Sequence, residues 1–397
     1  MIVSKKMLAK SSGLQTIRAN DIIKVSVDYC LINDGVSHKC IDYMQDDDLL
    51  YNNNKVIVAI DHDTPSGSVE ASRIQNKLIN FSKKYNTPLY NGQGIGYQLM
   101  IDNYLIEGQV VVSSGLHVST MGASGALNFN LSYDKLYEVL KTGTVEIKVP
   151  EFVKIELTGV LAKEADGKDI ILYIIKNIDK CWTKGKIVEF YISEPTNLSA
   201  DDKVTLCNLS SEIGAMATVI SFEKSNDDEY NYTYKVDLSK ISSMIVFPDN
   251  FNYIKNVVNL EEIKINEVFI GGCAGGGIED LRKAANIVKG KKVARTVRLM
   301  IAPKTSNVYI QALKEGLIND FLEAGAIVMN QGCSTCYGKS QGIIDPDEVL
   351  VSTGSYNCKG CAGAESAKIY ITSAKVAAIS AIKGTLSKGY KWERNLC

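Results

Sequence analysis

Three cysteines in two glycine-rich turns are the residues of this chain best suited to hold an inorganic centre. Cys333 and Cys336 stand three residues apart after the apolar run 324–328, and Cys273 lies within the sequence Gly-Gly-Cys-Ala-Gly-Gly-Gly. Thiolates at the first spacing serve zinc sites, iron–sulfur clusters and redox pairs. Three thiolates could hold three corners of a four-iron cluster and leave the fourth iron open to a substrate oxygen, whereas a structural zinc would need a fourth ligand elsewhere.

Two of the three histidines follow strand-like segments. His62 comes directly after Asp61 at the end of the apolar run 55–60, and His117 follows the run 109–112. In open parallel sheets, ligands bind at the carboxyl ends of the strands. Histidine is the side chain best suited to move a proton near neutral pH. These positions therefore predict acid–base chemistry.

Length and charge limit the class of protein. A chain of 397 residues is long enough for two or three α/β domains. A formal net charge of -1 gives no electrostatic reason to expect nucleic acid or an anionic membrane as a partner. No apolar run reaches the length of a membrane span and the first ten residues lack a signal-peptide core, so we expect a cytoplasmic protein. Ten scattered cysteines are typical of reduced thiols, some of them ligands.

Alternating apolar runs and amphipathic segments predict the elements that position these residues. We expect helices at 68–85, 278–288 and 307–323, and strands at 22–30, 55–60, 109–112, 268–270, 297–301 and 326–329. Such alternation is typical of α/β domains with largely parallel sheets.

A series of short motifs resembles one known family. The motifs are Asp-His at 61–62, Gly-Ile-Gly-Tyr-Gln at 94–98, Leu-His-Val-Ser-Thr-Met-Gly-Ala at 116–123, Lys-Val-Pro-Glu at 148–151, Thr-Leu-Cys-Asn-Leu-Ser-Ser-Glu-Ile-Gly-Ala at 205–215, the Cys273 turn followed by Ile-Glu-Asp-Leu-Arg, and Cys333-x-x-Cys336. In this order, over roughly residues 20 to 390, the chain resembles the aconitase superfamily. It is most similar to the large subunit of 3-isopropylmalate dehydratase.

The resemblance implies a fold, a cofactor and a set of roles. It implies an aconitase-like fold of three α/β/α domains around a central cleft with a [4Fe–4S] cluster, without the family's swivelling fourth domain. The cluster would be held by Cys273, Cys333 and Cys336. Asp61 and His62 would protonate the departing hydroxyl, and His117, oriented by Glu212, would lie near the iron-bound water. The expected domains are 1–126 with Asp61, His62 and His117, 127–250 with Glu212, and 251–397 with the cysteines.

The resemblance also implies a partner. The family's swivelling domain carries a serine base, and in isopropylmalate dehydratases it is a separate small subunit. We therefore expect a separate small swivelling-domain subunit as the partner of this chain, together with a small-molecule substrate.

The departures from the family pattern are concentrated in the expected substrate pocket. The family's Asp-Ser-His-Thr is here Gly115-Leu-His-Val, and its His-Gln is Tyr97-Gln. Two arginines that grip carboxylates in the family are replaced by Tyr356 and Cys361. Arginine–carboxylate forks are strong and directional, so citrate and isopropylmalate are not expected as substrates. The side chains expected to contact the substrate instead are those of Lys39, Tyr97, Tyr356 and Lys359.

A second Cys-x-x-Cys, formed by Cys358 and Cys361, keeps the function open. One of these thiols could fill the open iron position, both could carry sulfur, or both could be buried. Three functions are compatible with the residues. The favoured one is an iron–sulfur hydro-lyase for an unusual small hydroxy acid. The alternatives are a desulfidase-like enzyme that handles sulfur at the open iron, and a non-catalytic cluster protein.

Overall fold

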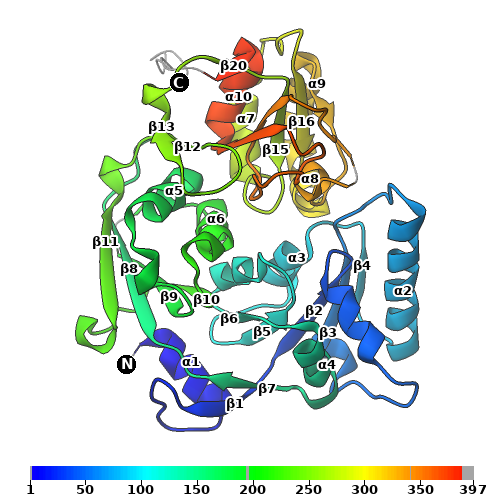
Figure 1. The fold of residues 1–397 in the computed structure, drawn as a ribbon, viewed down its shortest axis with the longest axis vertical. Helices are drawn as coiled ribbons and strands as arrows, with labels where there is room; N and C mark the ends of the chain where they lie inside the picture. Colours follow the sequence, from blue (N-terminus) through cyan, green and yellow to red (C-terminus); the bar gives the residue numbers. More distant parts are fainter. Residues whose placement is uncertain (1, 194–195, 340, 387–397) are drawn as a thin grey trace. The chain divides into compact units, whose positions relative to one another are not determined.

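The computed structural model describes residues 2–193, 196–339 and 341–386. By backbone packing the chain divides into two compact units (Figure 1). Unit 1 comprises residues 1–159, 178–196 and 206–237, and unit 2 comprises residues 160–177, 197–205 and 238–397. The three-domain division at residues 126 and 250 stays a prediction.

Unit 1 contains two parallel sheets. The first has the order β4-β3-β2-β5-β6 and the second the order β10-β9-β8-β11, and β1 pairs with β7 in an antiparallel ribbon. The strands are β1 (Ile22–Ser26), β2 (Tyr29–Asn33), β3 (Val56–Ile60), β4 (Leu89–Asn91), β5 (Val110–Ser113), β6 (Leu127–Asn130), β7 (Thr144–Lys148), β8 (Phe152–Thr158), β9 (Ile187–Ile192), β10 (Ala217–Ser221) and β11 (Tyr232–Asp237). All five residues of β3 are buried, as in strands that are covered on both faces.

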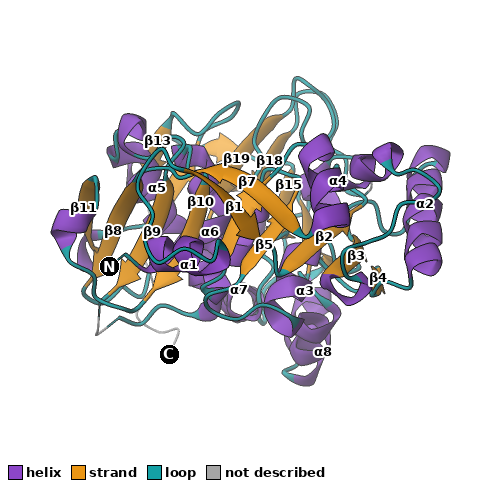
Figure 2. Cartoon of the chain, turned by 90° about the horizontal axis from the view of Figure 1, so that it is seen from below, coloured by secondary structure: helices purple, strands orange, loops and turns teal. Residues whose placement is uncertain are grey.

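Helices of unit 1 lie beside both of its sheets, and the first helix reaches the second sheet through hydrogen bonds from Ser4 to Glu189 of β9. They are α1 (Val3–Ser11), α2 (Val69–Tyr85), α3 (Gly96–Asn103) and α4 (Tyr133–Thr142), with the 3-10 turns η1 (Ser37–Tyr43), η3 (Val118–Ser124) and η5 (Leu209–Ile213). Figure 2 shows α2 beside β3 and β4, and its buried face contributes Leu78 and Phe81 to the core. Ser68 caps this helix by accepting a hydrogen bond from Ala71 N.

Unit 2 is built on a seven-stranded sheet of order β13-β12-β19-β18-β15-β16-β17. Strands β15 to β19 are parallel, and β12 runs antiparallel to both of its neighbours. The strands are β12 (Met244–Val246), β13 (Ile254–Asn256), β15 (Glu267–Gly271), β16 (Arg298–Ala302), β17 (Ile327–Val328), β18 (Val349–Ser352) and β19 (Lys368–Thr372), and β14 (Ile263–Lys264) pairs separately with β20 (Thr385–Leu386).

Helices pack on this sheet through small and branched residues. They are α5 (Gly167–Asn177), α7 (Ile278–Val288), α8 (Ser306–Lys314), α9 (Leu317–Ala324) and α10 (Ala374–Lys383), and α6 (Ala200–Asn208) runs from unit 2 into unit 1. Ala377 and Ala381 of α10 lie in one core with Leu281 and Val288 of α7. None of the helices built from the described residues is both long and apolar enough to cross a bilayer.

Two expected elements are each divided in the structure. The strand expected at 22–30 is two strands, β1 and β2, which belong to different sheets. The helix expected at 307–323 is broken into α8 and α9 by Gly316, whose φ of +77° is a left-handed conformation that glycine adopts without strain. Apolar periodicity continues across both breaks, which is why the sequence pattern alone did not separate the elements.

Candidate active site

Two buried carboxylates and a histidine meet at the carboxyl ends of β2 and β3 in unit 1. His62 Nδ1 lies 2.5 Å from Asp61 Oδ1 and 3.4 Å from Asp34 Oδ1. Asp34 Oδ1 also accepts hydrogen bonds from the backbone N–H groups of Asp61 (2.9 Å) and His62 (3.0 Å). The carboxylate of Asp34 therefore holds the turn on which the other two residues stand.

The charges of this group favour a protonated imidazole. Burial by itself lowers the pKa of His62, but the carboxylates of Asp61 and Asp34 outweigh burial and raise that pKa well above its usual value. Burial raises the pKa of Asp61. The Asp34 carboxyl is also buried, yet its hydrogen bonds with His62 and Asp61 hold its pKa well below the usual range. The group can therefore hold a proton on the histidine ring and give it to a substrate.

Two glycines allow this group to form. A Cβ at position 35 would lie 2.5 Å from His62 Nε2, so Gly35 keeps the outer edge of the ring uncovered. The backbone N–H of Gly96, at the start of α3, donates to Asp61 Oδ2 at 2.5 Å. A Cβ at position 96 would lie 3.0 Å from Ala59 Cβ, so the close approach of α3 to the carboxylate also needs glycine. The helix N-terminus stabilises the negative charge of Asp61.

His117 and Glu212 form a second pair in unit 1. His117 precedes η3 and is buried, and Glu212 lies in η5. Burial raises the pKa of Glu212, and the charge of His117 opposes that shift. Thr120 Oγ1 donates to His117 O at 2.6 Å and accepts from Asn208 Nδ2 at 2.8 Å, which ties η3 to the residue before η5. The structure thus brings together the two residues that the family resemblance pairs.

Tyr97 and Gly115, which both depart from the family pattern, fit each other sterically. Gly115 has a φ of +140°, and a Cβ there would lie 2.6 Å from Tyr97 Oη. The next nearest atoms would be Val36 Cγ2 at 3.5 Å and Tyr97 Cζ at 3.9 Å, which are ordinary contacts. Tyr97 is buried, so its hydroxyl cannot easily move aside. The hydroxyl takes the space that a side chain at position 115 would need, and the two replacements are therefore coupled.

The three cysteines expected as ligands all belong to unit 2. Cys273 follows β15 after Gly272, and Cys333 and Cys336 lie at the turn η9 (Ser334–Tyr337) that follows β17. Cys273 is buried, and Cys333 and Cys336 are partly buried. Burial raises the pKa of Cys336 to about 11, and the neighbouring Cys273 adds to that shift. The structure therefore brings together sulfurs from the two separate turns.

The surroundings of these sulfurs fit a multinuclear centre better than a single ion. A zinc ion about 2.3 Å from each thiolate would keep its sulfurs within roughly 4 Å of one another. Among residues 2–193, 196–339 and 341–386, three potential ligands whose ligand atoms lie within 4.8 Å of one another are found at Asp34, Asp61 and His62. The sulfurs of Cys273, Cys333 and Cys336 do not meet this limit and are therefore spaced more widely. Backbone N–H groups of Ser355 and Tyr356 donate to Cys336, an environment typical of iron–sulfur ligands.

The glycine run after Cys273 is explained by close packing. A Cβ at position 275 would overlap Thr353 Oγ1, and one at position 277 would overlap the Asp201 carboxyl. Thr353 Oγ1 in turn accepts from Gly271 N at 2.9 Å. Side chains at these two positions would therefore push the turn away from both neighbours.

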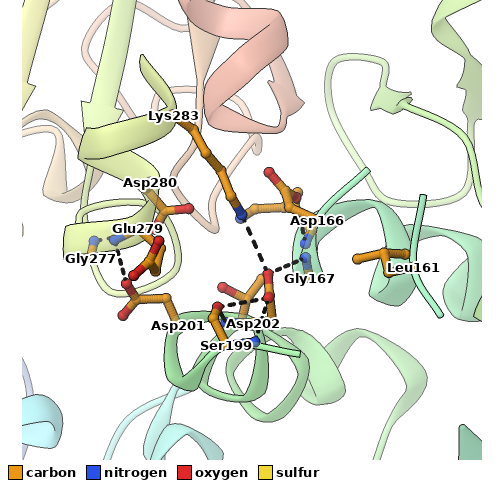
Figure 3. A network of polar contacts seen from close by, with 12 residues as sticks. Leu161, Asp166, Gly167, Ser199, Asp201, Asp202, Gly277, Glu279, Asp280 and Lys283 are labelled. Atoms are coloured by element: carbon orange, nitrogen blue, oxygen red, sulfur yellow. Dashed lines mark hydrogen bonds and ion pairs between the residues drawn. The ribbon is translucent and has the colours of Figure 1, made fainter. Parts of the chain in front are cut away.

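A largely buried network of carboxylates holds the start of α7, the helix that follows the Cys273 turn in the chain (Figure 3). Asp201 Oδ2 accepts from Glu279 N at 2.9 Å, and Asp280 Oδ2 accepts from Gly277 N at 3.2 Å. Burial raises the pKa of Asp280, and Asp201 and Asp166 add to that shift. Asp201 is the carboxylate that stays negative, because Lys304 lowers its pKa against the effect of burial, and the N–H groups and dipole of the helix N-terminus stabilise its charge. The network therefore fixes the direction in which the cysteine turn enters α7.

The remaining residues expected at the pocket have varied surroundings. Lys39 is exposed, and its Nζ lies 5.4 Å from the ring centroid of Tyr133. Lys359 is exposed, whereas Tyr356 is partly buried and donates its backbone N–H to Cys336. Their roles in substrate binding stay predictions.

Cys358 and Cys361 are joined in the structure as a disulfide. Cys358 is exposed and Cys361 is partly buried, so the structure does not match the one of the three alternatives in which both are buried thiols. The segment between β18 and β19 that carries them is mixed, with Thr353, Ser355 and Asn357 buried and Cys358 and Lys359 exposed. Whether either sulfur approaches a cluster stays a prediction.

Sequence reasoning missed Asp34 as a member of the His62 group. The signal was present, because Asn33-Asp34 follows the apolar run of β2 as Asp61-His62 follows β3. Since β2 and β3 are adjacent parallel strands, polar residues at their carboxyl ends must lie close together. The pairing of the strands is what the sequence alone did not show.

Comparison with known proteins identifies relatives that match this chain over almost its whole length. The model of the aconitase family (aconitate hydratase) matches residues 18–232 and 249–384. The methanogen homoaconitase large subunit of Methanocaldococcus jannaschii is 31% identical over 98% of this chain and 99% of its own. The 3-isopropylmalate dehydratase large subunit of Clostridium kluyveri is 32% identical over 98% of each chain, and that of Elusimicrobium minutum is 33% identical over 97% of each.

A solved structure shows the same fold at low identity. Thermococcus kodakaraensis aconitase X, in its holo form, superposes with a TM-score of 0.54 at 10% sequence identity, covering 87% of this chain and 88% of that one. The α/β architecture expected from the sequence is confirmed, as is the resemblance that the motifs indicated. The chain belongs to the aconitase family.

Proposed function

We propose that this chain is the cluster-bearing subunit of a hydro-lyase for a small hydroxy acid other than citrate or isopropylmalate. The observation that carries the proposal is the Asp34–Asp61–His62 group, in which buried carboxylates hold a proton on an imidazole. A hydro-lyase must protonate the hydroxyl group that leaves, and a cationic histidine in a largely buried environment suits that task. Dehydratases among the relatives support the reaction class.

The thiolates of Cys273, Cys333 and Cys336 suit a [4Fe–4S] cluster, which when bound would supply a Lewis acid for the substrate hydroxyl. The chain's own residues would bind, orient and protonate. His62 would deliver its proton to the leaving oxygen, while Asp61 holds the ring through Nδ1. His117, held in place by the turn that Thr120 and Asn208 brace, would orient the water that is released or added.

The altered residues of the pocket indicate a substrate with fewer carboxylates. Tyr356 and Cys361 stand where the family resemblance places arginines, and neither can form a two-pronged bond to a carboxylate. Tyr97 and Gly115 together replace the family's histidine–aspartate pair with a buried phenol. We infer a monocarboxylate or a similarly small acid, with Lys359 as the cation that could meet it as a point charge.

A separate small subunit is part of the proposal. The relatives from Methanocaldococcus jannaschii and Clostridium kluyveri are named large subunits, a name that pairs with a small one. The base that removes the substrate's carbon-bound proton would come from that partner, as the family resemblance implies. The chain described here would supply the acid and the metal ligands.

The test is a substrate panel with the reconstituted holoprotein and a candidate small subunit under anaerobic conditions. Hydroxy monocarboxylates, hydroxy dicarboxylates, isopropylmalate and citrate are each followed by proton NMR for loss or exchange of water. We expect turnover of a monocarboxylate that disappears in the His62→Asn protein and persists in Lys6→Gln, a change at an exposed surface lysine. Faster turnover of citrate or isopropylmalate would refute the substrate assignment, and full activity of His62→Asn would refute the acid.

A second function is favoured by one observation, the pairing of the exposed Cys358 with the partly buried Cys361. The same loop includes the backbone donors to Cys336, so a sulfur carried there would be close to a cluster ligand. A protein of this kind would hydrolyse a thiolated substrate, in which the oxygen of water replaces the sulfur and the sulfur leaves as hydrogen sulfide. Replacing both cysteines with serine should abolish such an activity and leave the hydro-lyase reaction intact, so unchanged sulfur release would rule the second function out.

A further inference from the structure

Lys168 is a buried cation that the proposed proton chemistry does not use. It lies in the first turn of α5 in unit 2 and is 3% exposed. Its Nζ donates to the backbone carbonyl oxygens of Thr353 at 2.9 Å and Gly354 at 3.0 Å. Burying a charge is strongly unfavourable unless it is well hydrogen-bonded, so these two contacts are what keeps the ammonium group in place.

The turn that Lys168 contacts lies against Cys336. A Cβ at position 354 would lie 2.8 Å from Cys336 Sγ. The next two residues, Ser355 and Tyr356, donate their backbone N–H groups to that sulfur and lower the pKa of the thiol against the effect of burial. A single peptide group, between Gly354 and Ser355, therefore has its carbonyl on Lys168 and its N–H on Cys336.

This arrangement has an electrostatic consequence. A cation on the carbonyl oxygen polarises the peptide and strengthens the hydrogen bond that its N–H donates. Hydrogen bonds to cluster sulfurs and nearby positive charge stabilise the more negative, reduced state, and they are among the main factors that set a cluster's potential. Burial lowers the pKa of Lys168, and the neighbouring Cys273 and Asp280 oppose that shift.

We propose that Lys168 is a positioning residue for the iron–sulfur centre, which acts through the Gly354–Ser355 peptide to align the N–H donors on Cys336 and to raise the centre's reduction potential. The inference rests on the proposed function, because it requires a cluster at these cysteines. A raised potential makes the centre harder to oxidise. Lys168 would therefore protect the cluster from oxidants without touching the substrate.

The test is a redox titration of the anaerobically reconstituted full chain, followed by EPR in the absence of substrate. Lys168→Met keeps the length of the side chain and removes its charge. We expect the reduced state to be disfavoured about tenfold, which for a one-electron couple is a potential lowered by about 59 mV. Lys168→Arg keeps the charge and should move the potential back toward that of the wild type.

Lys154→Met is the matched control. Lys154 is also buried, at 2% exposed, but it belongs to unit 1, where its Nζ lies 2.8 Å from Asp227 Oδ1. This change should lower the melting temperature and leave the potential unchanged. If Lys168→Met assembles no cluster, the reduction potential of Lys168→Gln is compared with that of the wild type instead. The amide of Gln is neutral but can still donate hydrogen bonds to the two carbonyls.

The outcomes separate this inference from the proposed function. A wild-type protein that binds no iron and sulfide overturns the proposed function and the inference together. If the wild type holds a cluster but the Lys168 variants have the same reduction potential as the wild type, the inference alone is overturned. The same holds if Lys154→Met shifts the potential as much as Lys168→Met does.

Discussion

The contact between Tyr97 and Gly115 gives a prediction that can be tested without any substrate. Replacing Gly115 with alanine introduces a Cβ 2.6 Å from Tyr97 Oη and forces a non-glycine residue to a φ of +140°. Overpacking against a buried side chain such as that of Tyr97 costs about 1–3 kcal/mol, and a strained backbone conformation costs about 1–3 kcal/mol. We therefore expect Gly115→Ala to lower the free energy of unfolding by about 2–6 kcal/mol.

A second change separates the two costs. Tyr97→Phe removes only the hydroxyl oxygen, after which the nearest atoms to the new Cβ are Val36 Cγ2 at 3.5 Å and the ring carbon Cζ at 3.9 Å. The steric cost should then vanish, while the backbone cost remains. The double variant should be more stable than the sum of the single changes predicts, by a coupling energy of about 1–3 kcal/mol.

The assay is differential scanning calorimetry of the four proteins of this cycle. For a body of 150–250 residues, 1 kcal/mol shifts the melting temperature by about 2–4 °C, so the coupling should be easy to resolve. Gly108→Ala is the control, because Gly108 has a φ of +89° in unit 1 with no atom within 4 Å of a Cβ built there, and it therefore measures backbone strain alone. Equal destabilisation by Gly115→Ala with and without the Tyr97→Phe change would refute the steric account of the Tyr97–Gly115 contact.

Three further predictions follow from the site and its supporting strands. Asp61→Asn removes the carboxylate that most raises the pKa of His62, so we expect a loss of turnover of about 10²- to 10⁴-fold. Because His62 must be protonated to act as the acid, the alkaline limb of the pH–rate profile should also move to lower pH. Burial raises the pKa of Glu267 to about 7, so between about pH 4.5 and pH 7 the folded state retains a proton that the unfolded state has lost. The free energy of unfolding should therefore fall as the pH rises through that range. Urea unfolding of Glu267→Gln should show a free energy of unfolding that depends less on pH there. Cys336→Ser should abolish the binding of iron and sulfide, measured chemically after anaerobic reconstitution.

Each of these predictions has its own control. Asp42→Asn changes an exposed carboxylate paired with Lys77 and should leave the pH–rate profile in place. Arg298 lowers the pKa of Glu348, so the contribution of Glu348 to stability is lost as the pH falls. Glu348→Gln should therefore remove a rise of stability with pH, whereas Glu267→Gln should remove a fall. Cys181 is exposed and lies in unit 1, so Cys181→Ser should retain the full content of iron. The assignment of Asp61 is contradicted if Asp42→Asn moves the pH–rate profile as Asp61→Asn does. The assignment of Glu267 is contradicted if both glutamate changes alter the pH dependence of stability in the same direction, and that of Cys336 if Cys181→Ser loses iron as Cys336→Ser does.

Much of the fold was accessible from the sequence because its signals are local. The strand at 56–60 and the helices at 69–85 and 278–288 were predicted within a residue or two, since apolar runs, capping residues and glycine stops act over a few neighbours. The breaks at Val27-Asp28 and Gly316 were missed. There the hydrophobic period continues while the backbone changes direction, and only the pairing of strands and the left-handed glycine reveal the change.

The order of the motifs, and with it the family, was determined by the sequence alone, as were the cysteine turns and the Asp-His dipeptide. Tertiary structure decided which residues act with them. Asp34 joins His62, Tyr97 fills the space at Gly115, and Lys168 reaches Cys336 through a peptide group, each across a gap in the chain that no local pattern spans. The physical reason is that hydrogen bonds, steric exclusion and pKa shifts depend on distance and burial, which arise only when the chain has folded.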